Sequence, residues 1–296
     1  MSLCFGIYAP AGFATEPEAV ARAAARLAQM GHRVVVDAGA TARWQRFGGT
    51  DDERLAAITR INADADVDVA LSVRGGYGWT RLLDRIDYAA LARSGKRWLG
   101  HSDFTAFQLA AMAHGGMRTF AGPMAAYDFG AAAPSAYTLD HCLALLESRE
   151  HGFDCALDGP AIDVDGTLWG GNLSLCATLC GTRHFPNVDG GILFLEDVAE
   201  HPYRIERMLY QLHFAGVLAR QRAVLLGAFT DYRLNDHDGG YDFAAAVAQI
   251  RGVSGVPIYT GLPFGHIRDK VTLPVGGQAR LRVRDGAARI ELSDYA

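Results

Sequence analysis

Short apolar runs alternate with amphipathic stretches through the first half of the chain. Between the runs, capping boxes open two predicted helices, one at Thr15-Glu16-Pro17-Glu18 that continues to Met30, and one at Thr50-Asp51-Asp52-Glu53 that continues to about Ala63. The apolar runs predict four strands, at residues 3–8, 32–36, 67–73 and 97–99. Such alternation is typical of a parallel sheet with helices on both faces. Ligands of these sheets bind beyond the carboxyl ends of the strands.

The pattern changes near residues 150–168, where the chain becomes polar and rich in turns. Helices are predicted to begin at Asn172 and near Pro202. Strands are predicted at residues 192–195, 223–226, 256–259, 270–273, 279–283 and 287–292. We therefore expect an α/β protein with a parallel-sheet domain over residues 1–155, a linker over 156–164, and a smaller, β-rich α+β domain, partly barrel-like, over 165–296.

Composition and charge narrow the class of protein. Of the 296 residues, 50% are hydrophobic and 21% charged, which fits a soluble globular protein, and the net charge of −5 comes without any basic stripe for nucleic acid. No apolar run is long enough for a membrane span, and the first residues lack the features of a signal peptide. Five cysteines, an odd number, predict reduced thiols in a cytoplasmic protein.

Ser102 stands at a predicted turn between a strand and a helix, in Gly100-His101-Ser102-Asp103-Phe104. A serine at the tip of such an elbow can point its hydroxyl into a cleft and act as a nucleophile. The alternative is a serine that only caps the helix. Phe104 stands where the Gly-x-Ser-x-Gly motif of α/β-hydrolases has its second glycine. This argues against an α/β-hydrolase but not against another kind of elbow.

Three further segments carry candidate chemistry. The glycine loop at residues 74–78 offers backbone N–H groups, either as the wall of an oxyanion hole or simply as a tight turn. Glu196 ends an apolar run, where it either orients a histidine or is a solvated acid. His266 lies in a loop rich in glycine and proline, and catalytic groups concentrate on such loops.

These segments together resemble the L,D-carboxypeptidases, a family of serine peptidases that includes the microcin C self-immunity hydrolases. The likeness runs in order over about residues 3–275. Its motifs are Arg74-Gly75-Gly76-Tyr77-Gly78, Arg81-Leu82-Leu83, Gly100-His101-Ser102-Asp103, Gly170-Gly171-Asn172-Leu173-Ser174-Leu175, Gly181-Thr182, Ile192-Leu193-Phe194-Leu195-Glu196-Asp197, Tyr203-Arg204-Ile205-Glu206-Arg207-Met208-Leu209 and Gly265-His266.

The resemblance implies a flavodoxin-like first domain, a β-rich second domain, a homodimer, and a Ser-His-Glu triad that needs no metal or cofactor. Position by position, Ser102 corresponds to the nucleophile, His266 to the base and Glu196 to the acid. The backbone N–H groups of Gly76 and Asp103 correspond to the oxyanion hole. The sequence departs from the family at His101, where tyrosine is frequent, and at Trp79, where a small residue is common.

The resemblance also implies the substrate, a cytoplasmic murein tetrapeptide that loses its terminal D-alanine during cell-wall recycling. Arg74 is a candidate clamp for the terminal carboxylate or a buried structural arginine, and Asn172 is a further substrate-binding candidate. The nearest alternative is a microcin-type hydrolase of an acyl-sulfamoyl adenylate or peptidyl-nucleotide, with Trp79 or Trp169 stacked on adenine. A non-enzymatic, flavodoxin-like ligand-binding module is the third possibility, and it predicts that Ser102, Glu196 and His266 lie far apart.

Overall fold

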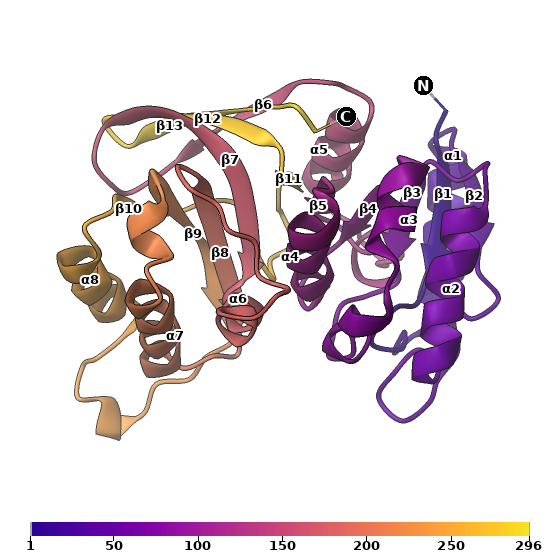
Figure 1. Ribbon diagram of the computed structural model, residues 1–296, viewed down its shortest axis with the longest axis horizontal. Helices are drawn as coiled ribbons and strands as arrows, with labels where there is room; N and C mark the ends of the chain where they lie inside the picture. Colours follow the sequence, from indigo (N-terminus) through magenta and orange to yellow (C-terminus); the bar gives the residue numbers. More distant parts are fainter. Residues whose placement is uncertain (1, 296) are drawn as a thin grey trace.

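The computed structural model describes residues 2–295, which form two sheets, one in each half of the molecule (Figure 1). The first sheet has six strands, five of them parallel, with one antiparallel strand at the edge. Their spatial order is β11 (Leu273–Val275), β5 (Thr119–Ala121), β4 (Arg97–Gly100), β3 (Val69–Ser72), β1 (Cys4–Tyr8) and β2 (Arg33–Val36). Without β11, this is the 2-1-3-4-5 order of flavodoxin-like folds, as expected.

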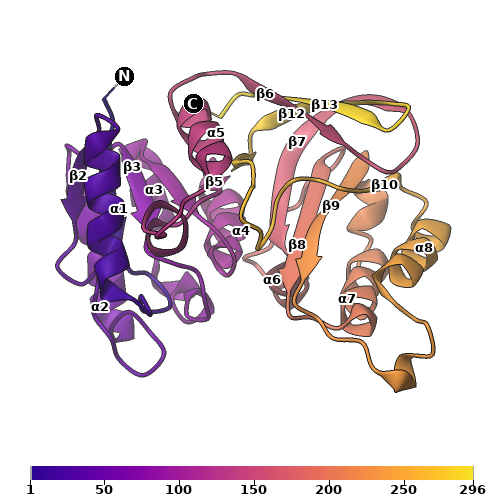
Figure 2. The same ribbon diagram turned by 180° about the vertical axis from the view of Figure 1, so that it is seen from behind.

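Helices cover both faces of the first sheet. The helices α2 (Asp51–Ala63), α3 (Tyr88–Ser94) and α4 (Phe104–Gly115) lie in front in Figure 1, whereas α1 (Pro17–Gln29) and α5 (Ala136–Leu146) lie in front in the reverse view of Figure 2. A π-helical turn, η3 (Ala125–Phe129), packs against α1 and α5. The strands β1, β3, β4 and β5 are largely buried, which explains why they appear in the sequence as continuous apolar runs, whereas the edge strand β2 is partly exposed.

The second sheet has seven strands, in the order β10 (Ile258–Thr260), β9 (Ala223–Thr230), β8 (Ile192–Val198), β7 (Ile162–Asn172), β12 (Gln278–Arg284), β13 (Ala287–Ser293) and β6 (His151–Ala156). The helices α6 (Leu173–Leu179), α7 (Pro202–Phe214) and α8 (Phe243–Ser254) accompany its parallel part. A single bridge between Asp158 and Thr260 joins the two edges, so the described strands curve toward a barrel without closing one.

Local sequence signals explain some boundaries and fail at others. Thr50 forms the expected capping box with Glu53 at the start of α2. The capping box expected at Thr15 is wrong, because the N-cap of α1 is Glu16 and its side chain makes no capping hydrogen bond. The strand expected at 270–273 begins only at Leu273 and joins the first sheet, where it pairs with β5. The domain limits given above stay a prediction.

Within residues 2–295, no helix combines the length and the apolar composition that crossing a bilayer requires. All five cysteines are free thiols, and Cys4, Cys142 and Cys176 are buried.

Candidate active site

Ser102 occupies the sharp turn between β4 and α4. Its φ is +64°, in the left-handed region that a residue with a side chain rarely adopts. The turn is tight because Gly100 lies directly under the ring of Phe104, where an added Cβ would be 2.5 Å from the ring. Phe104 is itself fully buried, so it packs behind the elbow and does not approach a ligand.

The structure brings Ser102, His266 and Glu196 together from three distant segments. The Oγ of Ser102 lies 3.0 Å from Nε2 of His266, and Nδ1 of His266 lies 2.7 Å from Oε2 of Glu196. Glu196 is fully buried within β8, whereas 21% of the His266 side chain is exposed. The alternative of a binding module with these groups far apart therefore does not fit the geometry.

The environment of His266 favours its protonated form. Burial alone lowers the pKa of His266, but the hydrogen bond and charge of Glu196, with a contribution from Asp197, outweigh burial and raise the pKa above 6.5. The carboxylate also selects the tautomer, since Nδ1–H donates to Glu196 and leaves Nε2 free to accept the Ser102 proton.

Asn172 belongs to the support of this site. It is buried at the N-cap of α6, and its amide donates to Glu196 Oε1 at 3.3 Å and to Asp197 Oδ1 at 2.8 Å. Asp197 also accepts the backbone N–H of Ser174 and the Ser174 hydroxyl. The Asn172 side chain thus orients the acid, and its expected contact with substrate stays a prediction. The sequence signal for Asp197 was only its position after Glu196.

His101 packs under the ring of His266. The two ring centroids are 4.6 Å apart, and Phe264 meets His101 edge-on at 5.1 Å. Burial, assisted by the charges of His266 and Lys270, holds the pKa of His101 well below 6.5. A neutral imidazole therefore stands where the family often has tyrosine.

The glycine loop lies against the elbow. A Cβ added at Gly75 would be 2.6 Å from both the His101 carbonyl oxygen and the Ser102 Cβ. Gly76 follows with φ +83°. Among the described residues, the Gly76 backbone N–H has no backbone acceptor and remains available to a developing oxyanion, whereas the Asp103 N–H lies against its own side-chain carboxylate.

The two tryptophans offered as candidates for stacking on adenine under the microcin-type alternative are both in the core. Trp79 is fully buried, with one face stacked on Phe107 at 4.7 Å. Trp169 is 1% exposed, and its indole N–H donates to Gln221 at 2.9 Å. Neither ring offers a face to a ligand, and sequence alone could not distinguish a buried tryptophan from an exposed one.

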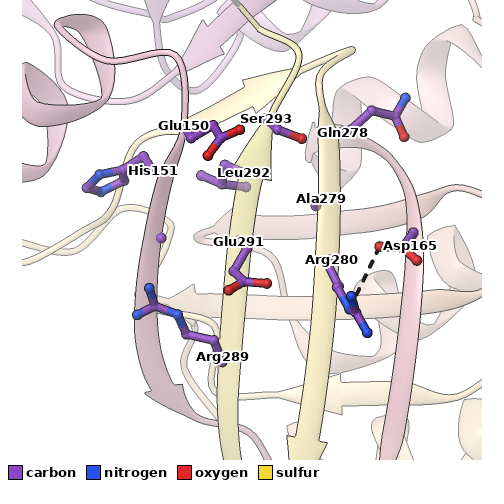
Figure 3. Close-up of a pocket in the computed structure, with 11 residues that line it drawn as sticks. Glu150, His151, Asp165, Gln278, Ala279, Arg280, Arg289, Glu291, Leu292 and Ser293 are labelled. Atoms are coloured by element: carbon purple, nitrogen blue, oxygen red, sulfur yellow. Dashed lines mark ion pairs between the residues drawn. The ribbon is translucent and has the colours of Figure 1, made fainter.

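A cavity of about 290 Å³ opens beside His266, with Tyr127, Arg268 and Lys270 in its walls. A larger hollow of about 520 Å³ lies on β6, β7, β12 and β13 (Figure 3), strands that carry none of the three grouped residues. There, basic and acidic side chains alternate, as in the pair Arg280 and Asp165.

Three side chains with metal-ligating atoms, His101, Glu196 and His266, lie within 4.8 Å of one another. The 2.7 Å between His266 Nδ1 and Glu196 Oε2 is a hydrogen-bond distance, which fits a proton shared by the two atoms. In this arrangement Glu196 orients the imidazole of His266. We assign no metal to this group.

Comparison with known proteins gives matches over most of the chain. Residues 5–122 match the LD-carboxypeptidase N-terminal domain, and residues 165–281 match the LD-carboxypeptidase C-terminal domain. The murein tetrapeptide carboxypeptidase of Pseudomonas aeruginosa is 34% identical over 256 residues, which cover 81% of this chain and 80% of that protein. The probable murein peptide carboxypeptidase of Bacillus subtilis is 28% identical over 97% of this chain and 91% of its own length.

Comparison with solved structures also gives matches over nearly the whole chain. The muramoyltetrapeptide carboxypeptidase from Oxalobacter formigenes superposes with a TM-score of 0.93 and 44% identity, covering 99% of both chains. The microcin C7 self immunity protein MccF, in complex with aspartyl sulfamoyl adenosine, superposes with a TM-score of 0.90 over 99% of this chain and 96% of its own. Its 21% identity shows a shared fold only.

Proposed function

Because this chain belongs to the LD-carboxypeptidase family and is a peptidase, we propose that it removes the terminal D-alanine of a murein tetrapeptide through a Ser102–His266–Glu196 triad. The observation that carries the proposal is the unbroken hydrogen-bonded chain from Ser102 Oγ through both ring nitrogens of His266 to buried Glu196.

In this mechanism, His266 Nε2 takes the proton of Ser102 as Oγ attacks the carbonyl carbon of the scissile peptide bond. The imidazolium that forms is stabilised by Glu196, and the N–H groups of Gly76 and Asp103 donate to the oxyanion. His266 then returns the proton to the leaving nitrogen, and D-alanine departs from a Ser102 acyl-enzyme. Water, deprotonated by His266, hydrolyses the ester and restores the serine.

A carboxypeptidase must also hold the free carboxylate of the terminal residue, and we assign this role to Arg74. The Arg74 guanidinium lies next to Gly76, because its Nη2 atom would be 3.5 Å from a Cβ added to that glycine. Arg74 forms no ion pair with any acid among residues 2–295. Planar guanidinium groups bind carboxylates through two parallel hydrogen bonds. Arg74→Ala is expected to raise KM for the tetrapeptide.

The test is incubation of the protein with a murein tetrapeptide and, in parallel, with aspartyl sulfamoyl adenosine, the ligand bound to MccF. We expect D-alanine release, followed by mass spectrometry, and loss of roughly 10⁴-fold or more of kcat in Ser102→Ala. Ser148→Ala, just beyond α5, is the matched control and should keep full activity.

Full activity in Ser102→Ala would refute the mechanism, and cleavage of the adenylate alone would replace the proposed substrate with the microcin-type one. The homodimer, the cytoplasmic location and the role in cell-wall recycling stay predictions from the family resemblance.

A further inference from the structure

Three arginines lie near the glycine loop, and the Asp103 carboxylate interacts at longer range with two of them, Arg46 and Arg74. Arg43, Arg46 and Arg74 form no ion pair with any acid in the described part of the chain. Each guanidinium instead lies over an aromatic ring, at 4.3 Å from Phe13 for Arg43, 5.9 Å from Tyr77 for Arg46 and 5.3 Å from Tyr127 for Arg74. A ring on one face leaves the N–H edge of the guanidinium free for an anion.

These arginines are connected to the reacting serine by short structural links. Tyr77, under Arg46, directly follows the oxyanion residue Gly76. Arg74 donates to the carbonyl oxygen of Phe13, the residue whose ring Arg43 covers. Tyr77 and Phe13 therefore link the three arginines to the segment that contacts the elbow.

Arg43 and Arg46 are held on a rigid turn. Trp44 and Phe47 exchange two backbone hydrogen bonds of 2.9 Å, and their rings stack at 5.9 Å. Phe47 is buried and also bridges to Gly12 in the loop after β1. A binding group on a rigid turn loses little conformational entropy when a ligand arrives.

The chain as a whole is acidic. Acidic residues outnumber Lys and Arg by 33 to 28, yet no acid neutralises these three cations through an ion pair. Local positive charge beside a site in an acidic protein raises the local concentration of anionic ligands.

We propose that Arg43 and Arg46 form a second anion subsite, which binds a side-chain or internal carboxylate on the acyl part of an acidic peptide. The terminal carboxylate lies at Arg74, and the scissile carbonyl points at Gly76, so the acyl part continues past Tyr77 toward the turn. The substrate class is therefore a peptide with at least two carboxylates. The assignment of the two ends rests on the proposed function.

The test uses two synthetic tetrapeptides that end in D-alanine and differ only at an internal glutamate, which carries a free carboxylate in one and a carboxamide in the other. Wild-type protein should have a KM several-fold lower for the carboxylate peptide, about three- to tenfold for two exposed charge contacts. The preference should decrease in 1 M KCl, where the screening length falls to about 3 Å. Arg43→Gln/Arg46→Gln should abolish the preference by raising KM for the carboxylate peptide to the value for the carboxamide peptide.

Arg93→Gln/Arg149→Gln is the charge-matched control. Arg93 is exposed in the last turn of α3. This helix leads into the amino end of β4, and the elbow lies at the opposite end of that strand. Arg149 is exposed beyond the end of α5. This control should keep the wild-type preference. Equal KM values for the two peptides in wild-type protein, or loss of the preference in the control, would overturn the subsite.

Binding of the same peptides to Ser102→Ala, measured by calorimetry, separates the subsite from the reaction. If neither peptide is cleaved by wild-type protein but Ser102→Ala binds the carboxylate peptide more tightly in an Arg43- and Arg46-dependent way, the proposed reaction is wrong and the subsite stands. If Ser102→Ala binds both peptides equally well, or neither, the subsite is wrong.

Discussion

Ser102 holds a backbone conformation that costs of order 1–3 kcal/mol for a residue with a side chain, and it keeps this conformation because its surroundings leave no other. The Phe104 ring lies beneath Gly100, and Gly75 lies against the Ser102 Cβ. The strain directs Oγ toward His266 before any substrate arrives. Preorganisation of this kind is one way in which an active site lowers a barrier without moving at the moment of reaction.

Glu196→Gln should reduce kcat about 10⁴-fold with little change in KM, as expected when an orienting carboxylate becomes an amide and the histidine adopts the wrong tautomer. Steady-state kinetics with the tetrapeptide measures the effect. Glu206→Gln on α7, which removes the charge of the carboxylate that accepts from the Tyr241 hydroxyl, is the control and should leave kcat within about twofold. A similar loss in both variants would mean that Glu196 has only a structural role.

The activity should decline on the acid side with a midpoint above pH 6.5. His266 accepts the serine proton only when neutral, and its raised pKa keeps it protonated to a higher pH than a free histidine. The value of kcat/KM therefore rises with pH through that raised pKa and is lost as the pH falls below it. A profile of kcat/KM from pH 4 to 9 tests this, and an acid limb below pH 6 would contradict the raised pKa.

At the scale of elements, the close contacts of Gly75 and Gly100 let the ends of β3 and β4 and the start of α4 meet at Ser102. The sequence pattern predicted the strand–turn–helix at Ser102, since its signals are local. It also predicted the helix after Asn172 and the strand that holds Glu196. It could not predict that Asn172 would orient Glu196, because that contact joins a helix cap to the neighbouring strand β8 through tertiary packing.

Gly75→Ala should abolish most activity, because its Cβ would overlap the His101 carbonyl oxygen and the Ser102 Cβ, both at 2.6 Å. Those neighbours are backbone and the nucleophile itself, so relief requires moving the elbow. Circular dichroism should show a folded protein, while kcat falls by about 10²-fold or more, the size expected from a displacement of about 1 Å.

Gly252→Ala makes the same chemical change in the interior of α8, where nothing lies within 4 Å of the added methyl. It should keep activity and stabilise the protein by about 0.5–1 kcal/mol, because alanine loses less backbone entropy in a helix. An active Gly75→Ala would show that the loop is less tightly packed on the elbow than its geometry indicates.

At the scale of the whole molecule, Ser102, Glu196 and His266 come from segments of both halves of the molecule. Hydrogen bonds attach the segment that carries His266 to elements around the first sheet. Lys270 donates to Asp128 of η3 at 2.5 Å and to the Ile267 carbonyl oxygen at 2.9 Å. Thr138 of α5 bonds to the backbone of Arg268 and Lys270. The chain then continues into β11 of the first sheet.

The contacts of Lys270 with Asp128 and of Thr138 with Arg268 and Lys270 join residues more than 100 positions apart, so no local pattern predicts them. They explain why 270–273 did not form the expected strand in the second sheet. Lys270 and Asp128 are 5% and 11% exposed, which makes theirs a buried ion pair across the base-bearing segment. Removing one partner of such a pair leaves an uncompensated charge, whereas replacing both can be nearly neutral.

Lys270→Met should therefore destabilise the protein by about 3–5 kcal/mol, and Asp128→Asn/Lys270→Met should recover most of that loss. Urea denaturation of wild type, both single variants and the double variant measures the coupling. Because the Lys270 charge lowers the pKa of His266, the double variant should also shift the acid limb of kcat/KM to higher pH. Additive stabilities together with an unmoved acid limb would show that the pair neither couples the segment to η3 nor acts on the base.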